Sequence, residues 1–155
     1  MKRFATAFTL LVLAACASTR HIEGTKIEDT EDNRDIVRVI ERYRRAMERR
    51  DAPALLAMAH PWYFEDSGTA KGDDDYGVQG LQKVLGDRLA QLKSIRYGIQ
   101  YKQITRAGNR ARVEIFIDGS YQMTAEGGDR WQRKADDNQI ELIKDDKGWR
   151  FLSGM

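Results

Sequence analysis

Apolar residues recur at helical spacing in the segment from residue 30 to residue 50. Ile36, Ile40, Tyr43 and Met47 follow one another at intervals of four, three and four residues, which places them on one face of a helix. Polar and charged residues fill the other faces. The pattern predicts a helix from Thr30 to Arg50. Three side chains near its start are suited to cap it, namely Thr30, Asp32 and Asn33.

Two further helices are expected after this one. Asp51-Ala52-Pro53 stops the first helix and offers an aspartate cap and an early proline to a second, mostly apolar helix, which Pro61 ends. The aromatic run Trp62-Tyr63-Phe64 suits a strand, and residues 66–77 are typical of a loop. Leucines at helical spacing then predict a third helix between Leu81 and Leu92.

After Lys93 the period of the apolar residues changes from helical to two. Residues 95–102 alternate, and so do residues 110–124, where Val113, Ile115 and Ile117 share a face opposite to Phe116. Further strands are predicted at residues 131–144 and 149–152. Short turns connect the four strands, at Ala107-Gly108-Asn109, Glu126-Gly127-Gly128-Asp129 and Asp145-Asp146-Lys147-Gly148.

The order of the elements indicates the fold class. Three helices precede a run of antiparallel strands, which is typical of an α+β domain with its helices on one face of the sheet. The 155 residues fit one domain of ordinary size.

The first residues have the pattern of an export signal. Lys2 and Arg3 are followed by an uncharged, mostly apolar run of 12 residues from Phe4 to Ala15. This run is too short to cross a bilayer, which takes about 20 residues, but it has the length and flanks of a secretory signal peptide. We therefore expect residues 1–15 to be a signal peptide.

Leu13-Ala14-Ala15-Cys16 resembles the lipobox of bacterial lipoproteins, and Cys16 is the only cysteine of the chain. The resemblance implies that the Cys16 thiol is lipidated and that the chain is cut before it, so that lipid anchors the protein to a membrane. The alternative is an ordinary signal peptide with a chance cysteine. Ala17 stands where inner-membrane lipoproteins carry aspartate, and this favours the outer membrane of the bacterial cell envelope.

Residues 16–30 are expected to be the lipidated cysteine and a tether, and residues 31–155 the folded domain. The predicted tether is polar, and its Ile22 and Ile27 are isolated from other apolar residues. About 14 extended residues reach roughly 45–50 Å, which is enough to hold a domain clear of lipid headgroups.

The net charge of the chain and its sequence motifs limit the kinds of partner and cofactor that we expect. The chain has 26 basic and 24 acidic side chains, and removal of Lys2 and Arg3 with the signal peptide would leave no net charge. We therefore expect no nucleic-acid partner, and we interpret the arginines of the first helix as a solvated face. The sequence has no phosphate-binding loop, zinc motif or nucleophile elbow, so no metal and no cofactor are predicted.

Three segments together resemble the nuclear transport factor 2-like (NTF2-like) superfamily, which includes the SnoaL-like and ketosteroid-isomerase-like proteins. They are the long helix, break and short helix of residues 42–58, the aromatic strand Tyr63-Phe64-Glu65-Asp66, and the two strands of residues 140–151 around a tight turn. The resemblance implies a cone, made by a curved antiparallel sheet with three N-terminal helices packed on it. The fold hosts enzymes, transport adaptors and assembly domains.

The resemblance also suggests candidate catalytic residues. It implies Tyr43 as a hydrogen-bond donor to an oxyanion and Asp66 as a general base, and His60 as a base in a SnoaL-like site. The ordinary structural alternatives are a packed tyrosine on an apolar stripe, an aspartate that caps a turn, and a histidine at a helix end. Trp62, Phe64 and Trp131 are candidates to line or fill the cone.

Two functions follow from these observations. The first is a lipid-anchored envelope domain with a non-catalytic binding or assembly role, which meets a protein partner or a second copy through the open sheet face around Phe116. The second is an exported enzyme or a carrier of a small apolar ligand, in which Asp66 abstracts a proton and Tyr43 donates a hydrogen bond.

Overall fold

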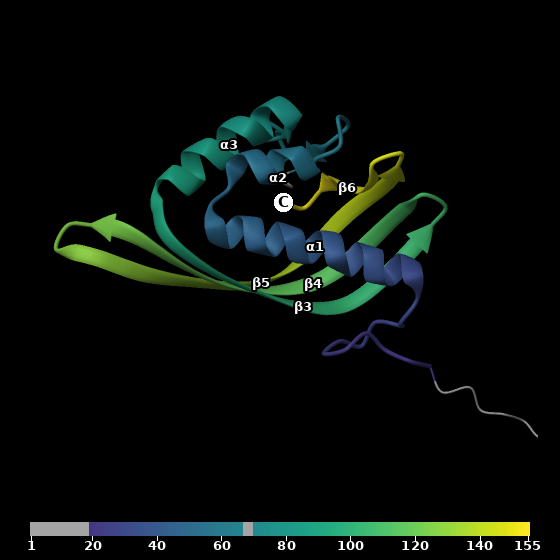
Figure 1. Cartoon of the computed structure of the whole chain (residues 1–155). Helices are drawn as coiled ribbons and strands as arrows, with labels where there is room; N and C mark the ends of the chain where they lie inside the picture. Colours follow the sequence, from purple (N-terminus) through teal and green to yellow (C-terminus); the bar gives the residue numbers. More distant parts are fainter. Residues whose placement is uncertain (1–18, 67–69) are drawn as a thin grey trace, which may run out of the picture.

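The protein is described by a computed structural model, in which residues 19–66 and 70–155 are placed. Three helices precede the main sheet, as expected from the pattern of apolar residues (Figure 1). The helices are α1 (Glu31–Arg49), α2 (Ala52–Met58) and α3 (Val78–Ala90). The strands are β1 (Phe64–Glu65), β2 (Tyr76–Gly77), β3 (Leu92–Ala107), β4 (Arg110–Ala125), β5 (Gly128–Asp145) and β6 (Gly148–Ser153).

Helix α1 begins and ends through local hydrogen bonds. Of its three candidate caps, Thr30 is the one used, because its hydroxyl accepts a hydrogen bond from the Asn33 N–H at 3.2 Å. The helix ends at Arg50, which adopts the left-handed conformation with φ 54°. The predicted apolar stripe faces inward, and Ile36, Ile40 and Tyr43 are buried.

Helix α2 is positioned by the break that precedes it. The Asp51 carboxylate accepts a hydrogen bond from the Ala54 N–H at 3.0 Å, and Pro53 lies in the first turn of the helix. Leu55 is fully buried against the core. The end of α2 is joined to the sheet, because Ala59 forms an isolated bridge with Phe151 and the His60 N–H donates to the Phe151 carbonyl oxygen at 2.8 Å.

Three long strands and the shorter β6 form one antiparallel sheet in the order β3-β4-β5-β6. The sheet curves, and α1 lies across its concave side with α2 and α3 beyond it (Figure 1). The hydrophobic core is the space between α1 and the sheet, where Tyr43, Ile115 and Phe151 are buried. This is the predicted α+β architecture, with the helices on one face of a curved antiparallel sheet.

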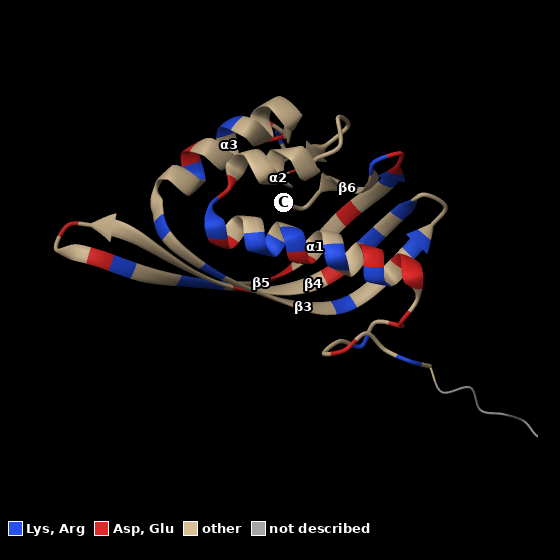
Figure 2. Cartoon of the chain, in the orientation of Figure 1, with Lys and Arg blue, Asp and Glu red and all other residues tan. Residues whose placement is uncertain are grey.

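The opposite face of the sheet carries the residues predicted for it. The register aligns Phe116 with Gln100 on one side and Asp137 on the other, so these three share the outer face. Charged positions of both signs are frequent along the strands (Figure 2). Ion pairs join β4 to β5 on this face, between Arg133 and Asp118 and between Arg112 and Glu141, and the Lys102–Asp137 pair connects β3 with β5 across β4.

The aromatic segment and the tether region differ in detail from the sequence expectation. Only Phe64 and Glu65 of the aromatic segment form a strand, which pairs with Tyr76 and Gly77 in a small second sheet. Within the predicted tether, residues 20–29 close into a turn in which the Ile22 N–H donates to the Ile27 carbonyl at 2.8 Å. Ile27 is buried at 4% exposure, which gives this polar segment an apolar contact that holds it closed.

No helix within the placed residues combines the length and the apolar character that crossing a membrane requires. The predicted signal peptide, Cys16 and Ala17 lie outside the described residues.

Candidate functional site

Tyr43, the candidate oxyanion donor, lies inside the protein between α1 and the sheet. Its side chain is 2% exposed. Its ring meets the edge of Tyr97 at a centroid distance of 5.9 Å and packs tilted against Phe151 at 5.2 Å. The hydroxyl groups of Tyr43 and Tyr97 are 3.2 Å apart and share a hydrogen bond. A buried aromatic cluster with a satisfied hydroxyl therefore occupies the place where a ligand would have to approach Tyr43.

Burial controls the protonation of these phenols. It raises the pKa of Tyr43 well above its usual value, and the neighbouring Tyr97 hydroxyl adds to this effect. Burial also raises the pKa of Tyr97 to about 12. Both phenols are therefore neutral at physiological pH and serve as hydrogen-bonding groups within the core.

Asp66, the candidate base, lies in a different part of the molecule. It is exposed and follows β1 directly. It contributes to an open hollow of about 540 Å³ whose other lining residues include Trp62, Phe64 and Arg110, but not Tyr43. The structure thus places the two candidate residues at separate locations, one in the core and the other on the surface.

His60 holds the junction between α2 and the sheet. It is 8% exposed, and its Nδ1 accepts a hydrogen bond from the Trp62 N–H at 3.1 Å. Its Nε2 lies 3.7 Å from the Asp145 carboxylate, and its ring meets Trp62 at a centroid distance of 4.9 Å. Because Nδ1 is an acceptor, the neutral ring carries its proton on Nε2, toward Asp145. Nδ1 thus stabilises the turn that follows α2, and Nε2 links this turn to the end of β5.

Asp145 extends this junction. Arg150 donates to its carboxylate from both Nε and Nη2, and the Lys147 N–H donates to it at 2.9 Å. Chiefly because of the Arg150 hydrogen bond, the pKa of Asp145 lies below its usual range. Folding therefore favours the ionised carboxylate. The resulting stabilisation is present above the ordinary aspartate pKa and is lost as the pH falls through the lowered value.

Replacing Asp145 with asparagine is expected to lower the thermal unfolding midpoint at pH 7, because the charged contact with Arg150 is lost. The difference from the wild type should begin to shrink as the pH falls below the ordinary aspartate pKa of about 3.9, and it should vanish below the lowered pKa of folded Asp145, where both proteins lack the charge. The measurement is thermal unfolding at pH 7 and pH 3. Asp146→Asn, at the exposed next position, is the control, and an equal Asp145→Asn deficit at both pH values would contradict the prediction.

The three aromatic residues considered for the cone lie on the surface. Trp62 is 70%, Phe64 53% and Trp131 46% exposed. Trp62 and Phe64 line the hollow with Asp66, whereas Trp131 lies on the outer face of β5 with the Arg96 guanidinium 4.8 Å from its ring centroid. The interior is filled instead by residues such as Tyr43, Tyr63 and Phe151. The aromatic character of these residues did not distinguish the two sets, because burial depends on where the fold places each ring.

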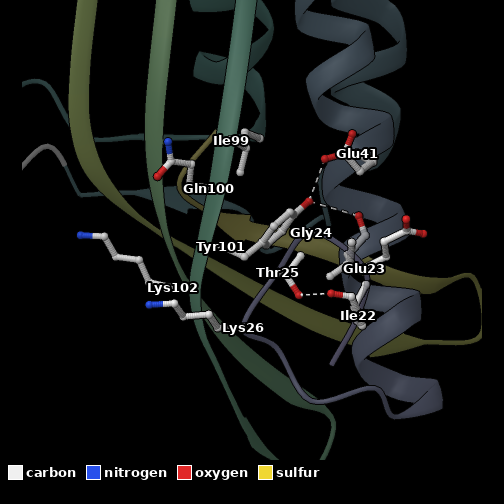
Figure 3. Close-up of a pocket in the computed structure, with 11 residues that line it drawn as sticks. Ile22, Glu23, Gly24, Thr25, Lys26, Glu41, Ile99, Gln100, Tyr101 and Lys102 are labelled. Atoms are coloured by element: carbon white, nitrogen blue, oxygen red, sulfur yellow. Dashed lines mark hydrogen bonds between the residues drawn. The ribbon is translucent and has the colours of Figure 1, made fainter. Parts of the chain in front are cut away.

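A second hollow, which the sequence did not indicate, lies between residues 22–26, α1 and β3 (Figure 3). Its volume is about 840 Å³. The Tyr101 hydroxyl donates to Glu41 Oε1 at 3.1 Å across it, while Lys26 and Lys102 extend toward the other side. The isolated Ile22 and Ile27 were the only sequence signal that this segment folds back on the domain.

Metal ligands do not gather anywhere in the part of the chain that the structure describes: it contains no group of three or more His, Cys, Asp and Glu side chains suited to hold an ion. The arrangement around Tyr43 and His60 thus offers packing and hydrogen bonds, and the open hollows offer surfaces for contact.

Comparison with known proteins identifies similar structures. No protein-family model matches the sequence, and no curated protein matches it significantly. A nuclear transport factor 2-like superfamily protein from Salmonella enterica has a TM-score of 0.67 and 15% identity, over 79% of this chain and 87% of that chain. A ketosteroid isomerase-like protein from Erwinia carotovora atroseptica has a TM-score of 0.66 and 18% identity, over 81% of this chain and 95% of that chain.

A third similar structure is a protein from Streptomyces avermitilis whose name places it in the NTF2-like family. Its TM-score is 0.65 at 15% identity, over 79% of this chain and 93% of that chain. At such identities the likeness is one of fold, and proteins that share a fold differ widely in activity.

Proposed function

We propose that this chain, which has the NTF2-like fold, is a lipid-anchored domain of the bacterial cell envelope that binds a protein partner and performs no catalysis. The partner is a second protein or a second copy of the chain, held at the outer face of the sheet. One observation carries the non-catalytic part of the proposal: Tyr43 is 2% exposed and its hydroxyl already bonds to Tyr97.

The positions of the candidate acid–base residues support this choice. A general base and an oxyanion donor must both reach one substrate, within hydrogen-bond distance of its reacting atoms. Tyr43 is closed off inside the core, and Asp66 is exposed beside Trp62 and Phe64. The alternative of an exported isomerase-like enzyme would require a common pocket for these two side chains, and the geometry favours a binding domain over it.

The lipid anchor rests on the sequence. Cys16 follows a 12-residue apolar run and the small residues Ala14 and Ala15, as in bacterial lipoproteins. Ala17 in the next position favours the outer membrane. Two or three acyl chains would hold the protein stably, since each buried methylene contributes about 0.8 kcal/mol.

The outer sheet face offers the binding surface. Phe116 on β4 lies half-buried among polar neighbours, with the Lys102 ammonium 5.9 Å from its ring centroid. Trp131 on β5 lies on the same face, because its register partner is Gln122, six residues along β4 from Phe116. Ion pairs between strands already neutralise most charges between the two aromatic rings, so covering the face leaves few charges unpaired.

Replacing Phe116 with glutamate tests this surface. We expect the substitution to reduce association at least tenfold, because it replaces the apolar centre of the contact with a second carboxylate beside Asp137, which already pairs with Lys102. The measurement is amine-reactive crosslinking of isolated membranes, in which the wild type yields an adduct and the variant does not. Phe64→Glu, which adds the same charge at an exposed phenylalanine of another surface, should keep the adduct. Equal adducts in all three proteins would contradict the prediction.

A further inference from the structure

A basic groove runs between α1, α2 and the start of β6, and it shares Arg150 with the junction around Asp145. Its volume is about 500 Å³. Five of its lining side chains are basic and none is acidic. The basic residues are Arg42, Arg45, Arg49, Lys147 and Arg150, and the other lining residues are Ala46, Ala54, Ala57, Met58 and Trp149.

The arginines of α1 are divided between two faces of the helix. Arg42, Arg45 and Arg49 follow one another at intervals of three and four residues, so they share the side that faces the groove. Arg44, on another side, is neutralised by ion pairs with Glu41 and Glu48 at 2.8 Å each. Basic positions are frequent along this second half of α1, next to α2 (Figure 2).

Two of the five groove cations have acidic partners, since Arg49 pairs with Asp51 at 3.9 Å and Arg150 pairs with Asp145, whereas the other three have none among residues 19–66 and 70–155. Within the described residues, no hydrogen bond or ion pair engages the side chains of Arg42, Arg45 or Lys147. Like charges at helical spacing of three and four destabilise a helix. The helix dipole favours cations only in the last turn, where Arg49 is the only basic residue. An anion held between these side chains would relieve their repulsion.

The floor of the groove is apolar. Ala46 and Trp149 are 1% and 6% exposed, and Ala54 and Met58 pack against the core from α2. The indole Nε1 of Trp149 is buried and has no acceptor in the described part of the chain. The floor thus offers an apolar contact surface beneath a rim of cations.

We propose that this groove binds an anionic amphiphile, with a phosphate or carboxylate head between the arginines and an apolar chain on the alanine, methionine and tryptophan floor. Guanidinium groups suit such heads because they donate two parallel hydrogen bonds to phosphate or carboxylate oxygens. The volume of about 500 Å³ fits one head with a short chain. The head belongs either to a free single-chain molecule or to an anionic lipid of the surrounding bilayer.

The test uses the full chain in phosphatidylcholine nanodiscs, titrated with hexyl phosphate. A Trp62→Phe/Trp131→Phe background leaves Trp149 as the only tryptophan, because the chain has three, so its fluorescence reports on the groove floor. We compare Arg42→Gln/Arg45→Gln with Arg34→Gln/Arg38→Gln. The second pair removes the same charge from the same helix at positions that pair with Asp29 and Asp35 outside the groove.

We expect saturable binding of hexyl phosphate that weakens about tenfold or more in the groove variant, and stays unchanged in the control variant. Inorganic phosphate should bind more weakly, because it lacks the apolar chain. If the natural ligand is a free single-chain molecule, hexyl phosphate should bind in this way in discs of neutral lipid. If the natural ligand is instead an anionic lipid of the bilayer, discs that contain phosphatidylglycerol should shift the Trp149 emission without added ligand. This shift should again require Arg42 and Arg45.

Three results would overturn the proposal. The first is the absence of a groove-dependent change with either hexyl phosphate or phosphatidylglycerol. The second is an equal loss of binding in the groove and control variants, which would indicate a general charge effect. The third is equal affinity for inorganic phosphate and hexyl phosphate, which would exclude a role of the apolar floor. Circular dichroism verifies that each variant is folded.

Discussion

Replacing Phe151 with alanine is expected to lower the free energy of unfolding by about 3–5 kcal/mol, which is the usual cost of removing a buried aromatic ring. Phe151 is fully buried and packs against Tyr43 at a centroid distance of 5.2 Å. Its carbonyl accepts the hydrogen bond from the His60 N–H, so its strand position also joins α2 to the sheet. Removal of the ring leaves a cavity between α1 and β6, which the surrounding rings can close only in part.

The measurement is urea unfolding followed by far-UV circular dichroism. Phe64→Ala serves as the matched control, because this phenylalanine is 53% exposed and its loss should change stability by about 0.5 kcal/mol or less. A similar small effect at both positions would mean that the interior is not closed around Phe151, and it would reopen the case for a ligand site beside Tyr43.

Replacing Cys16 with serine is expected to abolish acylation and stable membrane anchoring. The thiol is the only one in the chain, so the variant has no other site for a thioether-linked diacylglycerol. The wild type should have the mass of 140 residues, from Cys16 to Met155, plus two or three acyl chains. Each buried methylene of those chains contributes about 0.8 kcal/mol to membrane binding. Loss of the chains should therefore release most of the variant from the membrane.

Intact-mass analysis of the membrane fraction measures this change. Ala17→Asp is the matched control, since it should keep the acyl chains and move the protein from the outer to the inner membrane. A wild-type chain that is unmodified, or cut elsewhere than before Cys16, would remove the anchor from the proposed function. A freely diffusing exported protein would then be the next hypothesis.

The elements of the fold were predictable because local chemistry fixes them. Thr30 and Asp51 cap the first two helices through their own side chains, and the strands end at glycine-containing turns such as Ala107-Gly108-Asn109. These signals act over a few residues and do not depend on the rest of the structure. The short β1 was overextended in the prediction, because aromatic residues favour a strand but its pairing partner, Tyr76–Gly77, lies in a segment with loop composition.

The site was less predictable, because it depends on contacts between distant segments. The sequence placed Tyr43 on an apolar stripe, but its hydrogen bond to Tyr97 joins residues 54 positions apart. The basic groove likewise requires α1 to meet the β5–β6 turn, and the sequence showed only a run of arginines. Periodicity shows which face a residue occupies, whereas the partner across that face is set by the fold as a whole.

Site-specific photo-crosslinking in intact cells, with a photoreactive phenylalanine analogue at position 116, asks whether the outer sheet face holds a protein partner. We expect a single adduct at this position, with twice the mass of the chain for a second copy or another fixed mass for a different protein, and no such adduct from the same analogue at position 64. A chain that remains uncrosslinked at position 116 would contradict a binding role for the outer sheet face.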